Sequence, residues 1–290
     1  MASHGINGID HLVIAVRDLE RARDAYARMG FAVAPRGRHT ELKSVNHTIM
    51  FAADDYLELL AVEEPHPSTA HYSDFLAGRE GMAAVALKAN DARAARDLLN
   101  GTGFTAAEPV DFGRPVELPE GVRDARFTIT QIDPARTPGG RFFLCQHHSR
   151  DVVWRPDHMV HDNSATGLAA LVVAADEPDA VAGTLAPLFG TAVEDRGTVR
   201  VVPTGDTPIL VAKPGALRWA WTADPLLTAP RPFLAGAVVR VADLDRAQQA
   251  LQKSKFPTVV GNGVLRVSSA SAAGVMLAFA RDFDLGALIP

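Results

Sequence analysis

Hydrophobic and polar positions repeat four times along this chain in the same order. Each repeat has an apolar run of strand length, an acidic residue, and then apolar residues at helical spacing that reach a Gly or a Phe. The four apolar runs begin at His11, Ala84, Ala170 and Gly236, and the acidic residues that follow them are Asp18, Asp91, Glu177 and Asp243. This repeat predicts a strand followed by a helix, four times.

The helices have sequence signals at both ends. Each of the four acidic residues stands where a side-chain oxygen can accept from the first free backbone amides or offset the helix dipole. In the first helix, Leu19, Ala22, Tyr26 and Met29 fall on one face, and Gly30 follows as a left-handed cap. We therefore expect short amphipathic helices that pack with one face against a sheet.

Strand-like runs follow each helix. In the first repeat they cover residues 31–35, 45–51 and 56–62, and the other repeats end in runs at 141–147, 208–212 and 275–280. The order is βαβββ four times, and residues 109–140 are interpreted as an insertion that forms a hairpin and a loop. One unit cannot bury its sheet alone, so the units are predicted to pair into two half-barrels with the helices outside.

The predicted fold class is therefore α+β, built from four tandem βαβββ units. A chain of 290 residues is long enough for two ordinary domains. We expect an N-terminal domain over residues 1–150 and a C-terminal domain over residues 165–290. A histidine-containing linker near residue 155 would join them.

Composition narrows the class of protein. The net charge of −5 and the scattered Lys and Arg residues argue against a nucleic-acid partner. The single cysteine, Cys145, excludes a disulfide framework, so a reducing cytoplasm is the expected compartment. No signal peptide is predicted, and no uncharged apolar run approaches the ~20 residues that a membrane span needs.

Two polar residues on otherwise apolar strands are candidates for chemistry. His11 shares a strand face with Ile9 and Val13, and Glu58 lies between Leu57 and Leu59. A buried carboxylate without a partner costs several kcal/mol, so Glu58 is expected to have one. An imidazole and a carboxylate that face one cavity can hold a divalent metal ion, and Zn, Fe(II), Mn and Ni all fit such ligands.

The stretch Gly-Ile-Asp-His-Leu-Val-Ile-Ala-Val-Arg-Asp-Leu-Glu-Arg-Ala at residues 8–22 resembles the opening of vicinal-oxygen-chelate proteins. Residues 46–51 and 55–60 resemble the glyoxalase-like branch of that superfamily, which also includes bleomycin resistance proteins and extradiol dioxygenases. The resemblance implies a metal site with His11 and Glu58 as ligands. It also implies a last ligand on the eighth strand, for which Gln146 is favoured. Alternation leaves open whether Gln146 or Cys145 faces the cup.

Further residues of the N-terminal half are candidates for the same site. His47 is a candidate catalytic residue, and either His47 or His148 could act as a proton shuttle. Of Arg114, Arg123 and Arg126, which could each clamp a carboxylate or phosphate, Arg126 is the one we favour. The candidate substrate-binding residues are Asn46, Arg126, Phe142 and His148. For each of these, the alternative is an ordinary structural or solvated side chain.

The resemblance also has departures. The first strand of the second unit carries Ala84 where metal-dependent relatives often have His, and the third and fourth units carry Ala170 and Gly236. We therefore expect at most one ligand pocket, among residues 9–150. The C-terminal half is expected to be packed solid and to hold no metal.

These features support several function classes. The first is a metal-dependent lyase, isomerase or dioxygenase that acts on a small oxygen-rich substrate chelated through vicinal oxygens. The alternative is a metal-free protein that binds or sequesters a small molecule. The degenerate C-terminal half could also serve assembly, for example in a homodimer, and fold alone decides none of these.

Overall fold

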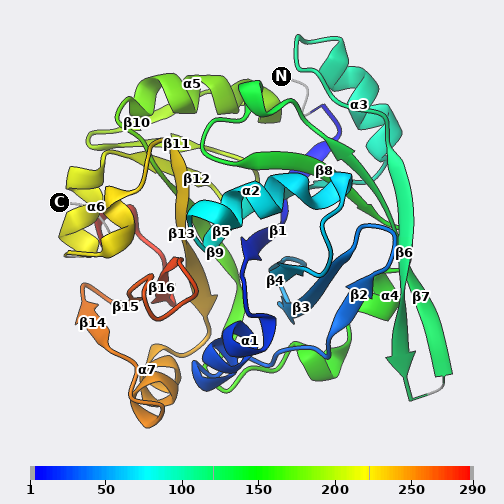
Figure 1. Ribbon diagram of the computed structural model, residues 1–290. Coiled ribbons are helices and arrows are strands. Elements are labelled where there is room, and N and C mark those ends of the chain that lie inside the picture. The colour runs from blue at the N-terminus through cyan, green and yellow to red at the C-terminus, as the bar shows by residue number, and fades with distance from the viewer. Residues whose placement is uncertain (1–3, 120, 222, 288–290) are drawn as a thin grey trace.

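Two mixed sheets of eight strands each carry the fold of this computed structural model, one from each half of the chain (Figure 1). The structure describes residues 4–119, 121–221 and 223–287. The first sheet contains β1 (Ile6–Ala15), β2 (Gly37–His39), β3 (Ser44–Met50), β4 (Tyr56–Val62), β5 (Gly81–Ala89), β6 (Val110–Leu118), β7 (Gly121–Gln131) and β8 (Arg141–His147). The second contains β9 (Ala165–Ala174), β10 (Glu194–Arg196), β11 (Val199–Val202), β12 (Ile209–Ala212), β13 (Phe233–Val241), β14 (Thr258–Gly261), β15 (Val264–Val267) and β16 (Met276–Ala280).

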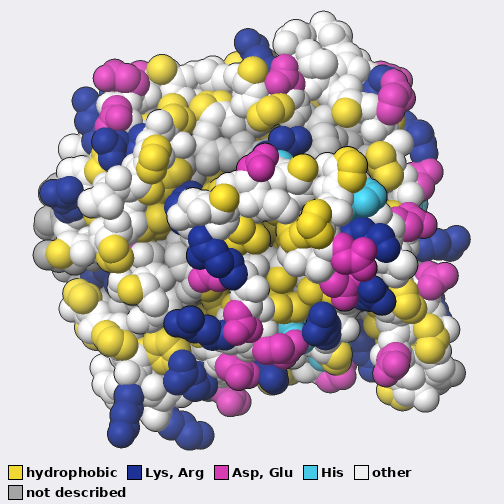
Figure 2. Space-filling model, in the orientation of Figure 1, with side chains coloured by type: hydrophobic (Ala, Val, Ile, Leu, Met, Phe, Trp, Pro, Cys, Tyr) yellow, Lys and Arg dark blue, Asp and Glu magenta, His cyan; other side chains and the backbone are white. Residues whose placement is uncertain are grey.

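The helices lie around these sheets. They are α1 (Leu19–Arg28), α2 (Ala70–Gly78), α3 (Ala92–Asn100), α4 (Arg150–Val153), α5 (Pro178–Phe189), α6 (Pro214–Ala220) and α7 (Leu244–Lys253). Short 3-10 helices are η1 (Pro67–Thr69), η2 (Pro134–Arg136), η3 (Pro156–His158), η4 (Pro225–Thr228) and η5 (Leu285–Ala287). Among the residues that the structure describes, no helix is long and apolar enough to cross a membrane. On the face shown in Figure 2, acidic and basic side chains are interspersed, as the scattered charges of the sequence predict.

Each sheet consists of two βαβββ units related by an approximate twofold axis. The strand orders are β2-β3-β4-β1-β5-β8-β7-β6 and β10-β11-β12-β9-β13-β16-β15-β14. At the centre of the first sheet β1 and β5 pair antiparallel, while β1 pairs parallel with β4 and β5 pairs parallel with β8. The predicted α+β fold of four βαβββ units in two half-barrels is confirmed.

The predicted helix starts follow the capping chemistry of their acidic residues. The side chain of Asp18 accepts from the amide of Arg21, and Asp91 and Asp243 each accept from two amides of the first turn. Glu177, the longer and weaker cap, makes no such bond. Gly30 follows the first helix with a φ of +89°, a conformation that favours glycine.

Two local predictions were wrong. Residues 31–35 form no strand; the second strand of the first unit is the short β2 further along the chain. Residues 109–140 are no insertion either, because β6 and β7 are the second and third strands of the second unit and form one long antiparallel hairpin. Both errors come from the middle strands of a unit, whose exposed faces carry a weak hydrophobic pattern.

The concave face of the second sheet is filled with apolar side chains. Side chains from α6 and η4 pack against the strands: Leu217 of α6, Trp221 directly after it, and Leu226 and Leu227 of η4. The Trp221 indole donates to the carbonyl of Leu277. By strand register, the positions that correspond to those of the first half are Ala170, Leu210, Gly236 and Ala278. None of these four side chains can ligate a metal or move a proton.

A buried carboxylate joins the two halves of the chain. Asp55, only 4% exposed, accepts from the backbone amide of Leu168 in β9. Burial is the largest cause that raises its pKa to about 7, while the Leu168 bond and the charges of Lys88 and Arg240 act in the opposite direction. Asp10, the further charge near it, also raises the pKa.

Asp55→Asn is expected to stabilise the protein at alkaline pH. A carboxyl whose pKa is raised on folding binds its proton more tightly in the folded state, so its stabilising effect is lost as the pH rises from 3.8 towards about 7. An amide has no charge to bury, and the gain at pH 8 should be about 2 to 4 kcal/mol. Urea unfolding at pH 4 and pH 8 measures this; equal stabilities of variant and wild type at pH 8 would contradict it.

Candidate functional site

The concave face of the first sheet encloses a cavity of about 310 Å³. Its floor comes from β1, β3, β4 and β8, its side from the β6–β7 hairpin, and η1 and α2 cover it. Figure 1 shows α2, in cyan, lying across the strands of this sheet. The aromatic lining residues are Tyr56, Tyr72, Phe112, Phe127 and Phe143, and the polar ones include His11, Asn46, Glu58, Arg114, Gln131 and Arg141.

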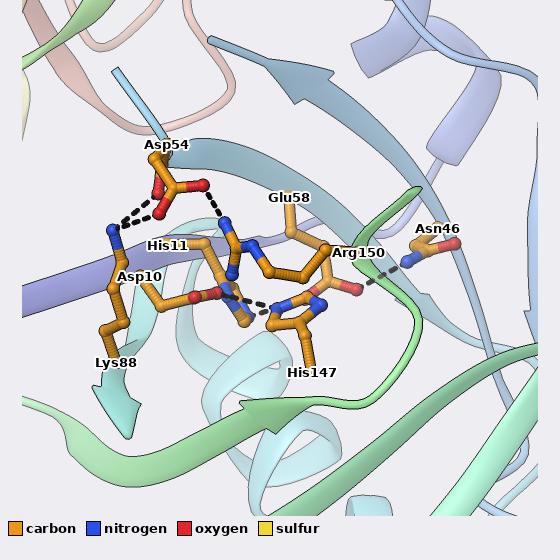
Figure 3. Close-up of polar contacts among 8 residues, drawn as sticks. All are labelled: Asp10, His11, Asn46, Asp54, Glu58, Lys88, His147 and Arg150. Carbon is orange, nitrogen blue, oxygen red and sulfur yellow. Dashed lines mark hydrogen bonds and ion pairs between the residues drawn. The ribbon is translucent and has the colours of Figure 1, made fainter. Parts of the chain in front are cut away.

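His11 lies between two carboxylates. Its Nδ1 lies 2.6 Å from Oδ1 of Asp10, and its Nε2 lies 3.6 Å from Oε2 of Glu58 (Figure 3). The ring stacks on Tyr56 with 4.2 Å between centroids, which holds its plane in place. Both ring nitrogens therefore face carboxylate oxygens: Nδ1 is hydrogen-bonded to Asp10, and Nε2 lies within ion-pair distance of Glu58.

Glu58 is held on its other oxygen. Asn46 of β3 donates from Nδ2 to Oε1 of Glu58 over 2.6 Å, because the two residues lie on neighbouring strands and point to the same face. Oε2 of Glu58 therefore remains towards His11 and the cavity. The carboxylate is 6% exposed, so its charge is buried and needs these partners.

Asp10 is the fully buried anchor of this group. Although burial alone would raise its pKa, the charges of His147 and His11 and their hydrogen bonds hold it well below the usual range. His147 donates from Nε2 to the same Oδ1 over 3.1 Å. The Asp10 carboxylate thus fixes two imidazoles at once.

A short segment after β8 closes the end of the cup beside Asp10. Trp154 packs edge-on against His147, with 4.8 Å between ring centroids, and the Arg150 guanidinium lies 3.8 Å over the Trp154 ring. Arg150 and Lys88 both bind Asp54, as Figure 3 shows. Arg150 also lies in the field of Asp10, which is fully buried.

The twofold relation shows which metal-ligand positions are filled. The twofold relation matches His11 of β1 with Ala84 of β5, and Val13 with Ala86. Since Glu58 pairs with Val13 and Phe143 pairs with Ala86, Phe143 occupies the position that corresponds to Glu58. The cavity holds only two of four such ligands, fewer than the three protein ligands usual for catalytic zinc or non-haem iron. A vicinal-oxygen-chelate metal centre at His11 and Glu58 does not fit the residues present.

A different buried group has metal-binding side chains. Ligand atoms of Asp10, His11, Cys145 and His147 all lie within 4.8 Å of one another, so this group could hold a metal ion. A metal there would replace the hydrogen bonds of Asp10 to the two imidazoles. Burial, the largest cause, raises the pKa of the Cys145 thiol well above its usual range, so it stays protonated without a metal.

The register of β8 corrects two predicted site residues. Phe143 and Cys145 line the cavity, whereas Phe142 packs in the core on the helix side. Gln146 shares that outer side and accepts from the amide of Ala92 at the start of α3. Gln146 is therefore not near Glu58, and Phe142 does not contact the cavity. Gln146 was favoured as a ligand because it is a polar residue after an apolar run, but its side chain binds the start of α3 instead.

Three other predicted residues also lie outside the cavity. Nδ1 of His47 lies 2.8 Å from the carbonyl of Ala34, and its Nε2 faces Glu20 on α1. His148 is exposed and bonds Thr128, and Arg126 is exposed on the outer face of the β6–β7 hairpin. Of the favoured site residues, the structure brings together His11, Glu58 and Asn46, while Arg114 and Cys145, which were considered as alternatives, line the same cavity.

Sequence reasoning missed Asp10 and Arg141, and among its three candidate arginines it favoured Arg126 over Arg114. Asp10 stands inside the Gly-Ile-Asp-His motif, so it had a signal. Arg114 reaches the cavity because it lies on β6 beside Gly37, where an added Cβ would lie 2.8 Å from Nη1 of Arg114 and overlap Oδ1 of Asn46. No sequence pattern shows such a contact between strands.

The fold and this cup define a protein of the vicinal-oxygen-chelate superfamily. The chain belongs to the glyoxalase-like domain family, whose model matches residues 9–189, more than half of the chain. No protein with a curated description matches the chain in sequence.

Solved structures share the fold at low sequence identity. A hypothetical protein from Staphylococcus aureus has a TM-score of 0.68 and 11% identity, and the match covers 94% of this chain and 99% of that one. A variant of 4-hydroxymandelate synthase from Streptomyces coelicolor has a TM-score of 0.58 and 12% identity, covering 98% and 97%. A fusion of a xylose isomerase-like TIM barrel with 4-hydroxyphenylpyruvate dioxygenase has a TM-score of 0.59 and 13% identity, and the match covers 98% of this chain and 50% of that one. At these identities the likeness concerns the fold alone.

Proposed function

We propose that this protein is a glyoxalase-like isomerase or lyase that moves a proton at a carbon next to a carbonyl group of a small substrate. The observation that carries the proposal is the pair of His11 Nε2 and Glu58 Oε2, 3.6 Å apart on the wall of one cavity. Each side chain is held from behind by a second polar residue, Asp10 for His11 and Asn46 for Glu58. Groups fixed in this way need little reorganisation when charge develops on a substrate.

Each member of the pair has one role in the proposed step. Oε2 of Glu58 takes the proton from the carbon, and the electrons of that C–H bond move to form an enol. Nε2 of His11 gives its proton to the carbonyl oxygen, so no free oxyanion forms. The enol then gives its hydroxyl proton back to Nε2 of His11 as the carbonyl re-forms. A proton from water added to the other face of the carbon completes an isomerisation, and Glu58 loses its proton to solvent. Alternatively, a leaving group on the next carbon departs with its bonding electrons, which completes an elimination.

A metal-dependent activity is a second candidate, favoured by the group of Asp10, His11, Cys145 and His147. A divalent ion bound there would supply Lewis acid chemistry to an oxygen of the substrate. The two candidates differ in the residues that they require. Metal retention should depend on His147 and Cys145 in the second candidate, while Glu58→Gln should leave it unchanged.

Solvent-proton exchange tests the proposed function. The protein is incubated in D₂O with 2-oxobutyrate or hydroxyacetone as first probes, and deuterium at the carbon next to the carbonyl is followed by NMR. The metal content is measured after purification without chelator, and exchange is repeated after EDTA dialysis. Exchange that survives dialysis supports acid–base catalysis by His11 and Glu58.

The other outcomes separate the alternatives. Exchange that is lost on dialysis and restored by a divalent metal ion favours the metal-dependent activity. Binding of small molecules without exchange at any probe favours the metal-free binding protein. The domain boundaries at residues 1–150 and 165–290 and the homodimer stay predictions, which limited proteolysis and light scattering can check.

A further inference from the structure

Two arginines project into the cavity without ionic partners. Among the described residues, no carboxylate lies within ion-pair distance of Arg114 or Arg141, and Nε of each is buried without a hydrogen-bond partner. Arg114 is 9% exposed, and burial is the main cause that lowers its pKa. Arg114 is buried, and Arg141 is partly buried with its Nε enclosed. Cations withdrawn from water without a counter-charge are costly, so a cavity that keeps these two is suited to receive an anion.

The charges around the cavity show how much negative charge is missing. Burial, the largest cause in each case, lowers the pKa of His39 and His71 to about 4, so both imidazoles are neutral near pH 7. His11 faces the Asp10 carboxylate, which His147 also contacts from outside the cavity. Among the other charged side chains that line the cavity, two guanidinium groups stand against one carboxylate, Glu58, so the lining has an excess of positive charge.

The two arginines have different surroundings. Arg114 lies in the field of Glu58, which acts to raise its pKa, and it packs beside Asn46 and Gly37. Arg141 acts electrostatically on His71 and Tyr72 of α2, and neither carries negative charge. Arg141 is therefore the cation without compensation, and its planar guanidinium can bind a carboxylate through two parallel hydrogen bonds.

The rest of the lining is largely aromatic and aliphatic. Phe112, Phe127, Ile129 and Phe143 supply apolar surface, while the side-chain oxygens of Asn46 and Gln131 are buried without partners. These oxygens can accept from a hydroxyl or amide of a ligand. An apolar body with one anionic end and a few polar groups fits this lining.

We propose that the substrate is a small monocarboxylate with an apolar body, whose carboxylate is bound by Arg141 and supported by Arg114. This inference rests on the proposed function, because it takes the cavity of His11 and Glu58 as the site of reaction. It adds the class of substrate and the residue that selects it. A phosphate ester shares the oxyanion chemistry but brings a second charge, which the cavity does not balance.

Matched ligands that differ in charge test the proposal. Isothermal titration calorimetry compares 3-phenylpropionate with 3-phenylpropionamide, propionate with propionamide, and phenyl phosphate as the dianion. Wild-type protein should bind the larger acid about ten- to a hundred-fold more tightly than its amide. Arg141→Gln should reduce that preference to about twofold or less, Arg141→Lys should keep part of it, and the control Arg126→Gln should not change it.

The outcomes are separable from those of the proposed function. Glu58→Gln should lose proton exchange but keep or strengthen acid binding, because it removes a negative charge from the cavity. Equal binding of acid and amide by wild type, or no acid binding at millimolar concentration, would overturn the proposal even if exchange occurs. Tighter binding of phenyl phosphate than of the acids would assign the site to phosphate esters instead. If Arg141→Gln does not fold, the wild-type comparison and its weakening by salt decide the question.

Discussion

Glu58→Gln is expected to lower the rate of proton exchange by about 100- to 10,000-fold, the usual contribution of a general base. The substitution keeps the shape of the side chain and leaves an oxygen for the Asn46 amide, which donates over 2.6 Å in the wild type. It removes only the basic oxygen that faces Nε2 of His11. The variant should therefore fold normally and bind ligands while it loses turnover.

His11→Ala should show a loss of the same order, and the double variant should be no worse than the slower single variant. Residues that act as one unit have non-additive effects, so additivity would show that the two side chains act separately. His47→Gln is the matched control, because His47 faces the carbonyl of Ala34 outside the cavity. The exchange rates of the two single variants, the double variant and the control are measured by NMR. An unchanged rate in Glu58→Gln would remove this residue from the mechanism.

Asp10→Asn is the second substitution with a large expected effect, at least about 100-fold on turnover. Asp10 does not contact the cavity; it acts on the reaction through the Nδ1 of His11 at 2.6 Å. Loss of its negative charge disfavours the imidazolium, which is a stronger proton donor to a carbonyl oxygen than the neutral ring. The alkaline limb of the pH–rate profile should therefore shift to lower pH, a result that a purely structural role would not produce.

The same substitution should also change stability with pH. Because the folded state holds the pKa of Asp10 below the ordinary value of 3.8, its carboxylate stabilises the protein above that pH and loses this effect as the pH falls below it. At pH 7 the variant is expected to lose about 1 to 3 kcal/mol, and below pH 3 the difference should shrink. Asp54→Asn, in the ion network with Arg150 and Lys88, serves as the control, and an unshifted pH–rate profile in Asp10→Asn would reject the positioning role.

The hydrophobic pattern by itself determined the four βαβββ units and their helix starts. Those signals are local: capping by Asp18, Asp91 and Asp243 involves amides two or three residues away, and β4 and β8 each consist of one largely apolar run of seven residues. The pattern also indicated that His11 and Glu58, on two different strands, face one cavity. The middle strands were less clear, because their hydrogen-bond partners and exposed faces are set by the hairpin rather than by periodicity.

Only the tertiary structure decided which side chains share the cavity. A shift of one residue in β8 exchanges Gln146 and Phe142 for Cys145 and Phe143, and alternation alone cannot choose between the two faces. The unbalanced charge at Arg141 likewise exists only because folding brings Arg114, Glu58 and Arg141 from different strands to one enclosed space. Sequence therefore determined the scaffold through local chemistry, while the site depends on strand register and burial, which form only when distant strands pair.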